Sequence, residues 1–331
     1  MLRYRLQLSV FTIIIALALV SCAKEVGETT EEVQARVLDS WISVKHPGSE
    51  KTPSGLYIID LSEGNGRKVT DSSYVFVQYV VRDLSGTILA TNNQAISEQL
   101  GQFSHSGHYG YNIWQVDQNA LYKGVEEILK RMRVGGRATV AFTPELATLS
   151  VSIYSLFSSL DATVNLQFEL ELVDCVDDIY AEYEEPMLRQ YSEKYYGGLD
   201  TLKRGFYFFK TKEAPVGDSI PTESQIKVRY IGHLLDGVVF DTNIQDTAKR
   251  YRIYDSKKSY EAMDVTFKSS IAEFKQSNSV IEGFADAIMR MRYGEKAVAF
   301  FWSQAGYGAG GSSPSIPEYT PICFEIEIKE K

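Results

Sequence analysis

Aromatic residues are the most plentiful candidates for a binding or catalytic site in this chain of 331 residues. It contains 21 tyrosines and 16 phenylalanines. Two polar residues in the C-terminal third stand out among them. Asp241 follows a run of strand-forming residues, and Tyr307 lies between two glycines. Neither position is typical of a core residue, since carboxylates are rarely buried and glycine loops lie at the surface. We therefore expect any site in this chain to be built from aromatic rings, with Asp241 and Tyr307 as candidate polar groups.

Metal and thiol chemistry have little support in the sequence. The four histidines and three cysteines are scattered, whereas a zinc site needs closely spaced ligands. His105 and His108 share a loop rich in glycine, serine and tyrosine without neighbouring acids or cysteines, and His46 stands apart. Cys175 and Cys323 fall at non-matching positions, so we expect two small buried hydrophobic side chains and no disulfide. We therefore expect neither a metal nor a cofactor.

The composition excludes two further classes of protein. The formal net charge is −9, whereas nucleic-acid binding needs a basic surface. Hydrophobic residues make up 44% and charged residues 23% of the chain, as in folded globular proteins and unlike disordered ones. We therefore expect globular domains that do not bind nucleic acid.

The chain repeats itself at an offset of about 150 residues. The matched segments are 55–59 with 205–209, 75–79 with 226–230, 124–135 with 283–294, and 168–172 with 324–328. The offset drifts slowly along the chain, which is typical of a duplicated domain with insertions and deletions in its loops.

The elements of each copy follow from hydrophobic periodicity. Residues 74–81 and 225–231 alternate as half-buried strands do, and residues 121–132 and 281–291 have helical spacing. Gly135 and Gly294 are placed to end those helices. Further helical stretches at 31–44 and 180–196 precede the two copies, with Pro186 acceptable only near a helix start or at a kink. The sequence predicts an α+β fold with two domains, each a mostly antiparallel twisted sheet on one short helix, joined by helical linkers.

The N-terminal residues have the pattern of a targeting segment. Arg3 and Arg5 precede an apolar run at 10–20, which is too short to span a membrane. The following Leu-Val-Ser-Cys22 resembles the lipobox of bacterial lipoproteins, and the alternative is an ordinary signal peptide with a chance cysteine. The resemblance implies cleavage before Cys22, lipidation of its sulfur and a lipid-anchored place in the cell envelope. Ala23 in place of an aspartate favours the outer membrane. The predicted division is signal peptide 1–21, tether and helix 22–54, first domain 55–175, helical linker 176–204 and second domain 205–331.

The sequence resembles the FKBP-type peptidyl-prolyl isomerases over roughly 56–174 and 206–329, and the second copy carries the matching motifs in order. Residues 235–241 are similar to the family's L-D-G-x-x-F-D segment, and 280–284 to V-I-x-G-W, with Phe284 in place of the tryptophan. Residues 306–308 resemble A-Y-G, and 316–317 resemble the I-P pair. Several separate pieces in the right order make this a specific signal. The positions that match the family's pocket are Tyr230, Phe240, Asp241, Val280, Ile281, Phe284, Tyr307, Ile316 and Phe324.

The resemblance implies cis–trans isomerisation of X-Pro bonds in unfolded or folding polypeptides. The uncatalysed barrier is about 18–20 kcal/mol, and an apolar pocket lowers it without covalent chemistry by favouring the twisted amide. In this comparison Phe284 forms the floor, Ile281 supplies a backbone N–H, and Tyr307 donates its hydroxyl to a substrate carbonyl. Asp241 supplies a polar contact beside the carbonyl. The segment 242–270 is a long insertion, and Phe274 is the expected aromatic before the Val-Ile pair.

The first copy keeps the scaffold residues but departs from the pocket pattern. Leu89 and Ala90 replace the Phe-Asp pair, and residues 121–125 replace V-I-x-G-W. We expect this copy to be an inactive domain for client binding or assembly. The main alternative for the whole chain is a non-catalytic chaperone or assembly lipoprotein, of the kind that accompanies gliding or secretion machinery. A glycan-binding lipoprotein is disfavoured, because the aromatic residues fall at fold positions.

Overall fold

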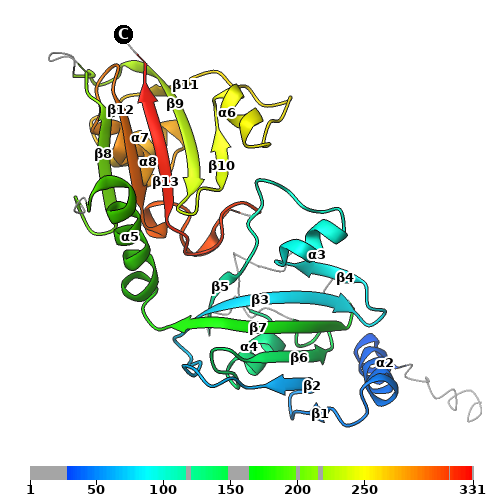
Figure 1. Ribbon diagram of the computed structural model, residues 1–331. Coiled ribbons are helices and arrows are strands. Elements are labelled where there is room, and N and C mark those ends of the chain that lie inside the picture. Colours follow the sequence, from blue (N-terminus) through cyan, green and yellow to red (C-terminus); the bar gives the residue numbers. More distant parts are fainter. Residues whose placement is uncertain are drawn as a thin grey trace, which may run out of the picture.

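The computed structural model describes residues 28–116, 121–147, 164–198, 202–214, 219–312 and 314–329. The predicted signal peptide and Cys22 lie outside these ranges. Two antiparallel sheets, one after the other along the chain, form two domains joined by a helical segment (Figure 1). Within the described ranges, no helix is both long and apolar enough to cross a membrane.

The first sheet has the strand order β1-β2-β6-β7-β3-β4, and β5 pairs with β3. Its strands are β1 (Glu50–Lys51), β2 (Tyr57–Ser62), β3 (Tyr74–Asp83), β4 (Ile88–Thr91), β5 (Asn112–Gln115), β6 (Arg137–Phe142) and β7 (Leu166–Val176). The helix α4 (Lys123–Leu129) covers one face of this sheet, and α3 (Gln94–Gln99) follows β4.

The second sheet repeats this order as β8-β12-β13-β9-β10, with β11 pairing β9. Its strands are β8 (Phe206–Lys212), β9 (Gln225–Leu234), β10 (Val239–Thr242), β11 (Met263–Thr266), β12 (Lys296–Phe301) and β13 (Ile322–Ile328). The helices are α6 (Gln245–Arg250), α7 (Ile271–Asn278) and α8 (Glu282–Met289), of which α8 is the counterpart of α4. The α+β fold class is confirmed, and the common strand order agrees with a duplicated domain.

The helices predicted at 121–132 and 281–291 are shorter than expected. Each ends in a tight turn, in which the N–H of Met132 bonds Leu129 O at 2.9 Å and that of Met291 bonds Ile288 O at 3.0 Å. Gly135 and Gly294 have φ of +83° and +76°, but they lie in the turns that lead into β6 and β12. Their left-handed backbone serves these turns, and the helices end before them.

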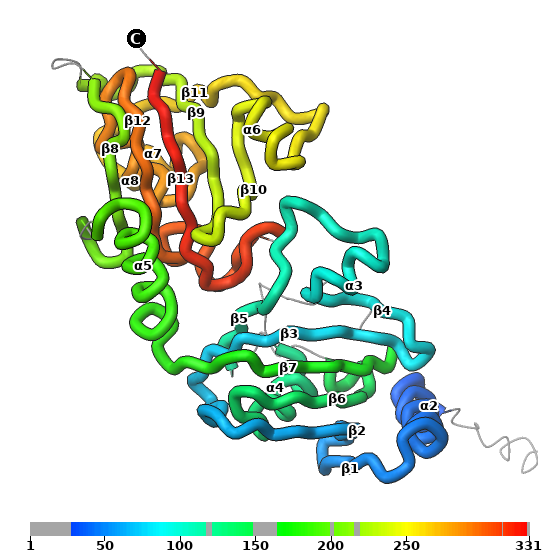
Figure 2. Tube along the Cα trace, viewed as in Figure 1, coloured from blue at the N-terminus to red at the C-terminus, as the bar shows by residue number. Residues whose placement is uncertain are grey.

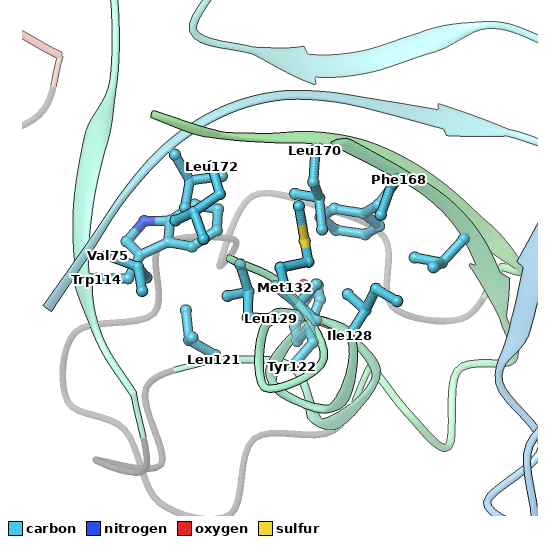
Figure 3. Packing of buried hydrophobic residues seen from close by; sticks show 14 of the residues in the cluster. Val75, Trp114, Leu121, Tyr122, Ile128, Leu129, Met132, Phe168, Leu170 and Leu172 are labelled. Carbon is cyan, nitrogen blue, oxygen red and sulfur yellow. The ribbon is translucent and has the colours of Figure 1, made fainter. Parts of the chain in front are cut away.

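The core of the first domain lies between the sheet and α4 (Figure 3). The helix and the residues just after it contribute Ile128, Leu129 and Met132, each 0% exposed. They pack against β7 side chains such as Phe168 and Leu170. Burial of such side chains contributes about 1.5–3 kcal/mol each, so this layer holds α4 in a fixed position under the sheet.

A helix precedes each sheet and packs on its outer face. In the first domain α2 (Thr30–Lys45) buries Leu38 and Ile42 against β2 and β6. In the second, the linker forms one π-helical turn (Tyr180–Glu184) and continues as α5 (Glu185–Tyr196), which buries Leu188 against Phe300. The helix prediction for 180–196 is confirmed, with Pro186 in its first turn.

The two domains contact each other directly as well as through the linker (Figure 2). Asn112 Nδ2 donates to Glu318 Oε2 at 3.0 Å, and Tyr319 OH donates to Gln115 Oε1 at 3.2 Å. Phe76 on β3 is 2% exposed and packs edge-on against Tyr183 of the linker at 4.8 Å between ring centroids. The prediction of a half-buried alternating strand is therefore wrong at Phe76, since contacts with the linker cover the outward face.

Candidate active site

A hollow of about 470 Å³ opens in the second domain, bounded by β9, β10, the start of α8 and the loop after β12. Of the predicted site residues, those that line it are Tyr230, Phe240, Asp241, Val280, Ile281, Phe284, Tyr307 and Phe324. They come from separate segments of the chain, which the sheet and the helix bring together. Ile281 is the residue immediately before α8, and its extended backbone (φ −72°, ψ 156°) directs the chain into the helix.

Phe324 on β13 is the centre of the aromatic lining. Its ring centroid lies 5.0 Å from that of Phe284, 5.7 Å from Phe240 and 6.1 Å from Tyr230. The contacts with Phe284 and Phe240 are edge-to-face, which aromatic quadrupoles favour by about 0.5–1.5 kcal/mol per pair beyond burial. Phe284 is 3% and Phe324 5% exposed, so these two rings form an apolar floor.

Gly232 on β9 makes room for this lining. A Cβ atom at this position would lie 2.6 Å from Phe240 Cε2 and 2.9 Å from Phe324 Cε1. Any larger residue therefore displaces one of the two rings. Gly232 was not among the predicted site residues, although a glycine inside a strand signals a close approach of another group.

The polar rim is centred on Asp241. Tyr230 OH donates to Asp241 Oδ2 at 2.7 Å, and Lys258 forms an ion pair with Oδ1. Burial, and then the charge of Asp241, raise the pKa of Tyr230, and the same two causes raise the pKa of Tyr307. Both phenols are therefore protonated at neutral pH, and Tyr230 donates its hydroxyl proton to Asp241. The Tyr307 side chain is 37% exposed, which leaves it accessible to a ligand.

Side-chain bonds hold the end of β10 against β9 and so position the rim. Asn243 Oδ1 accepts from Tyr230 N at 3.0 Å, and its Nδ2 donates to Val228 O at 2.9 Å. Thr242 Oγ1 donates to Tyr230 O at 2.7 Å. Thr91 and Asn92 make the same bonds in the first domain. The Thr-Asn pair that recurs in both copies is a sequence signal for this anchor, and it was not among the predicted features.

Two sequence predictions about the lining are wrong. Ile316 is 4% exposed and belongs to the hydrophobic core of the domain, and it does not line the hollow. Phe274, the expected aromatic before the Val-Ile pair, is 0% exposed and packs on Phe267. The insertion is followed by α7, which turns Phe274 into the core, and Met263 of β11 lines the hollow instead.

Among the described residues, larger side chains stand at the corresponding positions of the first domain. Val81 occupies the register position of Gly232, and it pairs with Phe168 as Gly232 pairs with Phe324. Tyr122 stands at the position of Ile281, is 2% exposed and packs edge-on against Phe168 at 6.1 Å. The ring of Trp114 is also buried, 5.5 Å from that of Tyr79.

The linker reaches the base of the loop that carries Tyr307. Glu184 is 2% exposed; its Oε2 accepts from Ser303 N at 2.6 Å and its Oε1 from Ser303 Oγ at 2.7 Å. Ser303 opens the short helical turn that leads to Gln304, Gly306 and Tyr307, all at the hollow. Burial raises the pKa of Glu184 to about 7, and the bonds from Ser303 oppose that rise.

The described residues contain no cluster of three or more His, Cys, Asp or Glu that could hold a metal ion. Cys175 and Cys323 are buried free thiols. Cys323 lies beneath α5, where Tyr191 OH approaches its Sγ at 3.8 Å. The hollow therefore offers shape, apolar surface and hydrogen bonds, with no nucleophile of raised reactivity among its described residues.

Comparison with known proteins places the second domain in a family. The model of the FKBP-type peptidyl-prolyl cis-trans isomerases matches residues 217–329. The chain therefore carries a domain of this family, and it is the domain that contains the hollow.

Two relatives, one from a plant and one from a bacterium, agree with this assignment. The chain is 31% identical over 128 residues to the chloroplastic peptidyl-prolyl cis-trans isomerase FKBP16-4 of Arabidopsis thaliana, covering 38% of this chain and 52% of that one. It is 28% identical over 134 residues to the FKBP-type 22 kDa peptidyl-prolyl cis-trans isomerase of Escherichia coli, covering 40% and 53%. The chain thus spans about half the length of these relatives. A crystal structure of the three FKBP domains of wheat FKBP73 aligns with a TM-score of 0.28 at 18% identity, covering 84% of this chain and 95% of that one.

The first prediction concerns Gly232. The substitution Gly232→Ala should destabilise the protein by about 1–3 kcal/mol, because the added methyl group overpacks the Phe240 and Phe324 rings. It should also weaken binding of a proline-containing peptide, because the floor is displaced. Thermal unfolding and fluorescence anisotropy measure the two effects. An unchanged melting temperature together with unchanged affinity would contradict the packing described here.

The second prediction concerns Glu184 and pH. Its folded pKa of about 7 exceeds the ordinary value of 4.5, so between these values the folded state binds more protons than the unfolded state. The free energy of unfolding should therefore fall as pH rises from about 4.5 to 7, by about 3 kcal/mol from this group. Glu184→Gln should remove that contribution.

Denaturant unfolding at pH 5 and pH 7.5 measures the contribution of Glu184 as a difference between wild type and variant. The control is Glu193→Gln, an exposed glutamate on the same helix, which should leave the pH dependence of wild type intact. An identical pH dependence for wild type and Glu184→Gln would show that the carboxylate is not desolvated as described.

Proposed function

We propose that the second domain catalyses cis–trans isomerisation of X-Pro bonds in unfolded or folding polypeptides. The observation that supports this proposal most directly is the hollow itself. In it, an aromatic floor of Phe284 and Phe324 lies beside the polar rim of Asp241 and Tyr307. Membership of the isomerase family and the names of the relatives support the same activity.

The proposed mechanism needs no covalent step. Rotation about the peptide bond costs about 18–20 kcal/mol because the planar amide loses resonance. The twisted amide has less charge separation than the planar one, so an environment without water favours it over the ground state. A proline ring on the floor of Phe284 would hold the bond in such an environment. The polar groups of the rim would then orient the reacting carbonyl electrostatically.

The rim supplies donors rather than bases in this mechanism. Burial raises the pKa of Tyr307, so its hydroxyl keeps its proton and can donate to a substrate carbonyl. Asp241 is bonded on two sides, by the hydroxyl of Tyr230 and by the ammonium group of Lys258. It is therefore suited to hold the geometry of the rim, and a role in proton transfer is not required.

The third prediction tests catalysis in the full chain. Tyr307→Phe and Asp241→Val should each lower kcat/KM at least tenfold, which corresponds to about 1.4 kcal/mol of transition-state stabilisation. Both positions are partly exposed, so the free energy of unfolding should change by no more than about 1 kcal/mol. A protease-coupled assay on a Leu-Pro-Phe peptide measures the activity.

The matched control is Tyr79→Phe, the counterpart of Tyr230 in the first domain. It should leave kcat/KM unchanged, because Val81 and Tyr122 stand where the second domain has Gly232 and Ile281. Full activity in Tyr307→Phe and Asp241→Val would refute the assignment of the site. If wild type has no activity but still binds an unfolded polypeptide, the non-catalytic chaperone function replaces the proposed one.

We further propose that the first domain binds client polypeptides or assembly partners without catalysing isomerisation. Support comes from Val81 and Tyr122, which stand at the positions of Gly232 and Ile281. Its contacts with the second domain, such as the bond between Asn112 and Glu318, are consistent with a supporting role.

We also propose that the protein is a lipid-anchored component of the cell envelope, with the anchor on Cys22. The support is the sequence Leu-Val-Ser-Cys22 after a short apolar run. Several acyl chains together make an effectively stable anchor, since each buried methylene contributes about 0.8 kcal/mol.

The fourth prediction tests the anchor. Cys22→Ala should move the protein from the membrane fraction to the soluble fraction of a bacterial host and remove the lipid mass from the N-terminal peptide. Ala23→Ser keeps the cysteine and should remain in the membrane fraction. Unchanged partition and unchanged peptide mass in Cys22→Ala would exclude lipidation at this residue.

A further inference from the structure

The segment 245–262, here called the basic flap, connects β10 with β11 at the rim of the hollow. It contains α6 and the loop after it, and it extends outward beyond β10 at the edge of the second sheet (Figure 1). Both of its flanks reach the hollow, because Asp241 precedes it and Met263 follows it. Its Lys258 also forms the ion pair with Asp241. The basic flap is thus physically continuous with the candidate active site.

The charge of the basic flap is opposite to that of the chain. Five lysines and arginines fall within residues 249–258, in a chain of net charge −9. Lys258 is paired with Asp241. The remaining four are exposed, and within the described ranges no ion pair involves them: Lys249, Arg250, Arg252 and Lys257.

The basic flap also contains three acids, Asp246, Asp255 and Glu261, so its five cations leave it a net charge of +2. Asp255 Oδ1 accepts from the backbone N–H of Lys257 at 2.8 Å, and Asp246 lies in the first turn of α6, where the helix dipole favours an acid. Lys249 lies over the ring of Tyr254 at 5.3 Å from the centroid, a contact that leaves its charge unneutralised. The flap therefore presents positive charge to solvent.

The first domain provides an internal comparison. Its corresponding segment, 94–111, contains no lysine or arginine. This segment packs against the second domain instead, where His108 N donates to Pro314 O at 2.8 Å. The positive charge is therefore confined to the copy that has the hollow, and the shared fold does not require it.

We propose that the basic flap binds acidic side chains of a proline-containing polypeptide while the proline occupies the hollow. This inference rests on the proposed function, and it names the substrate class as acidic segments. Opposite charges raise the local concentration and the association rate of a substrate, an effect that salt screens over about 10 Å at 0.1 M. A polypeptide is favoured over a lipid surface because the flap adjoins the hollow, and one chain can contact both.

The experiment uses the full chain and two labelled peptides, one with Glu-Glu and one with Gln-Gln before a shared Leu-Pro-Phe. Fluorescence anisotropy measures affinity, and the protease-coupled assay measures turnover. Wild type should prefer the acidic peptide about tenfold in affinity at about 20 mM salt and less than about twofold at about 0.5 M salt, because screening removes the attraction.

Two matched variants test whether the preference for the acidic peptide depends on the basic flap. The flap variant combines Lys249→Gln, Arg250→Gln, Arg252→Gln and Lys257→Gln, and it leaves Lys258 with Asp241. The control variant removes the same charge at exposed positions outside the flap, with Lys45→Gln, Lys68→Gln, Lys123→Gln and Lys194→Gln. The preference should disappear in the flap variant and persist in the control, with turnover of the neutral peptide unchanged in both.

The outcomes separate this inference from the proposed function. Equal affinity of wild type for the two peptides at low salt overturns the inference, whether or not they are turned over. An acidic preference in binding without turnover of either peptide supports the inference and refutes the isomerase activity. Binding of the flap to vesicles with about 30% anionic lipid, lost in the flap variant and without any peptide preference, overturns it in favour of a membrane surface.

Discussion

The pairing of β9 with β13 is the interaction on which the candidate site depends. It places Gly232 opposite Phe324, and the missing side chain lets the rings of Phe240 and Phe324 meet over the backbone. Phe324 in turn contacts Phe284 at the start of α8. The floor of the hollow is therefore also part of the domain core, and the same aromatic burial that stabilises the sheet keeps the hollow apolar.

The two domains share one scaffold and have different interiors. The strand order and the Thr-Asn anchor after the short edge strand are common to both. The difference arises at a few positions under the sheet, where Val81 and Tyr122 take the space that Gly232 and Ile281 leave open. Larger side chains at a few positions therefore change the interior while the strand order that defines the fold remains.

The linker supports the site of the second domain as well as joining the two domains. Through Glu184 it bonds Ser303 at the base of the Tyr307 loop, and Tyr180 packs edge-on against Trp302 at 4.7 Å. Two short hydrogen bonds from a single residue offset part of the cost of burying the carboxylate, and burial still raises its pKa to about 7. The position of the rim is therefore tied to the element that joins the domains, while the basic flap adjoins the same hollow from β10.

The repeat, the strand and helix types and most of the residues of the hollow could be predicted from the sequence, because periodicity and spaced motifs are local properties. Features that depend on packing between distant segments could not. Phe274 turns into the core, Ile316 remains outside the lining, and the linker covers Phe76. The role of Gly232 depends on the strand register, which places two rings above it. Strand register and helix docking set the neighbours of each side chain, and the spacing of residues along the chain does not encode them.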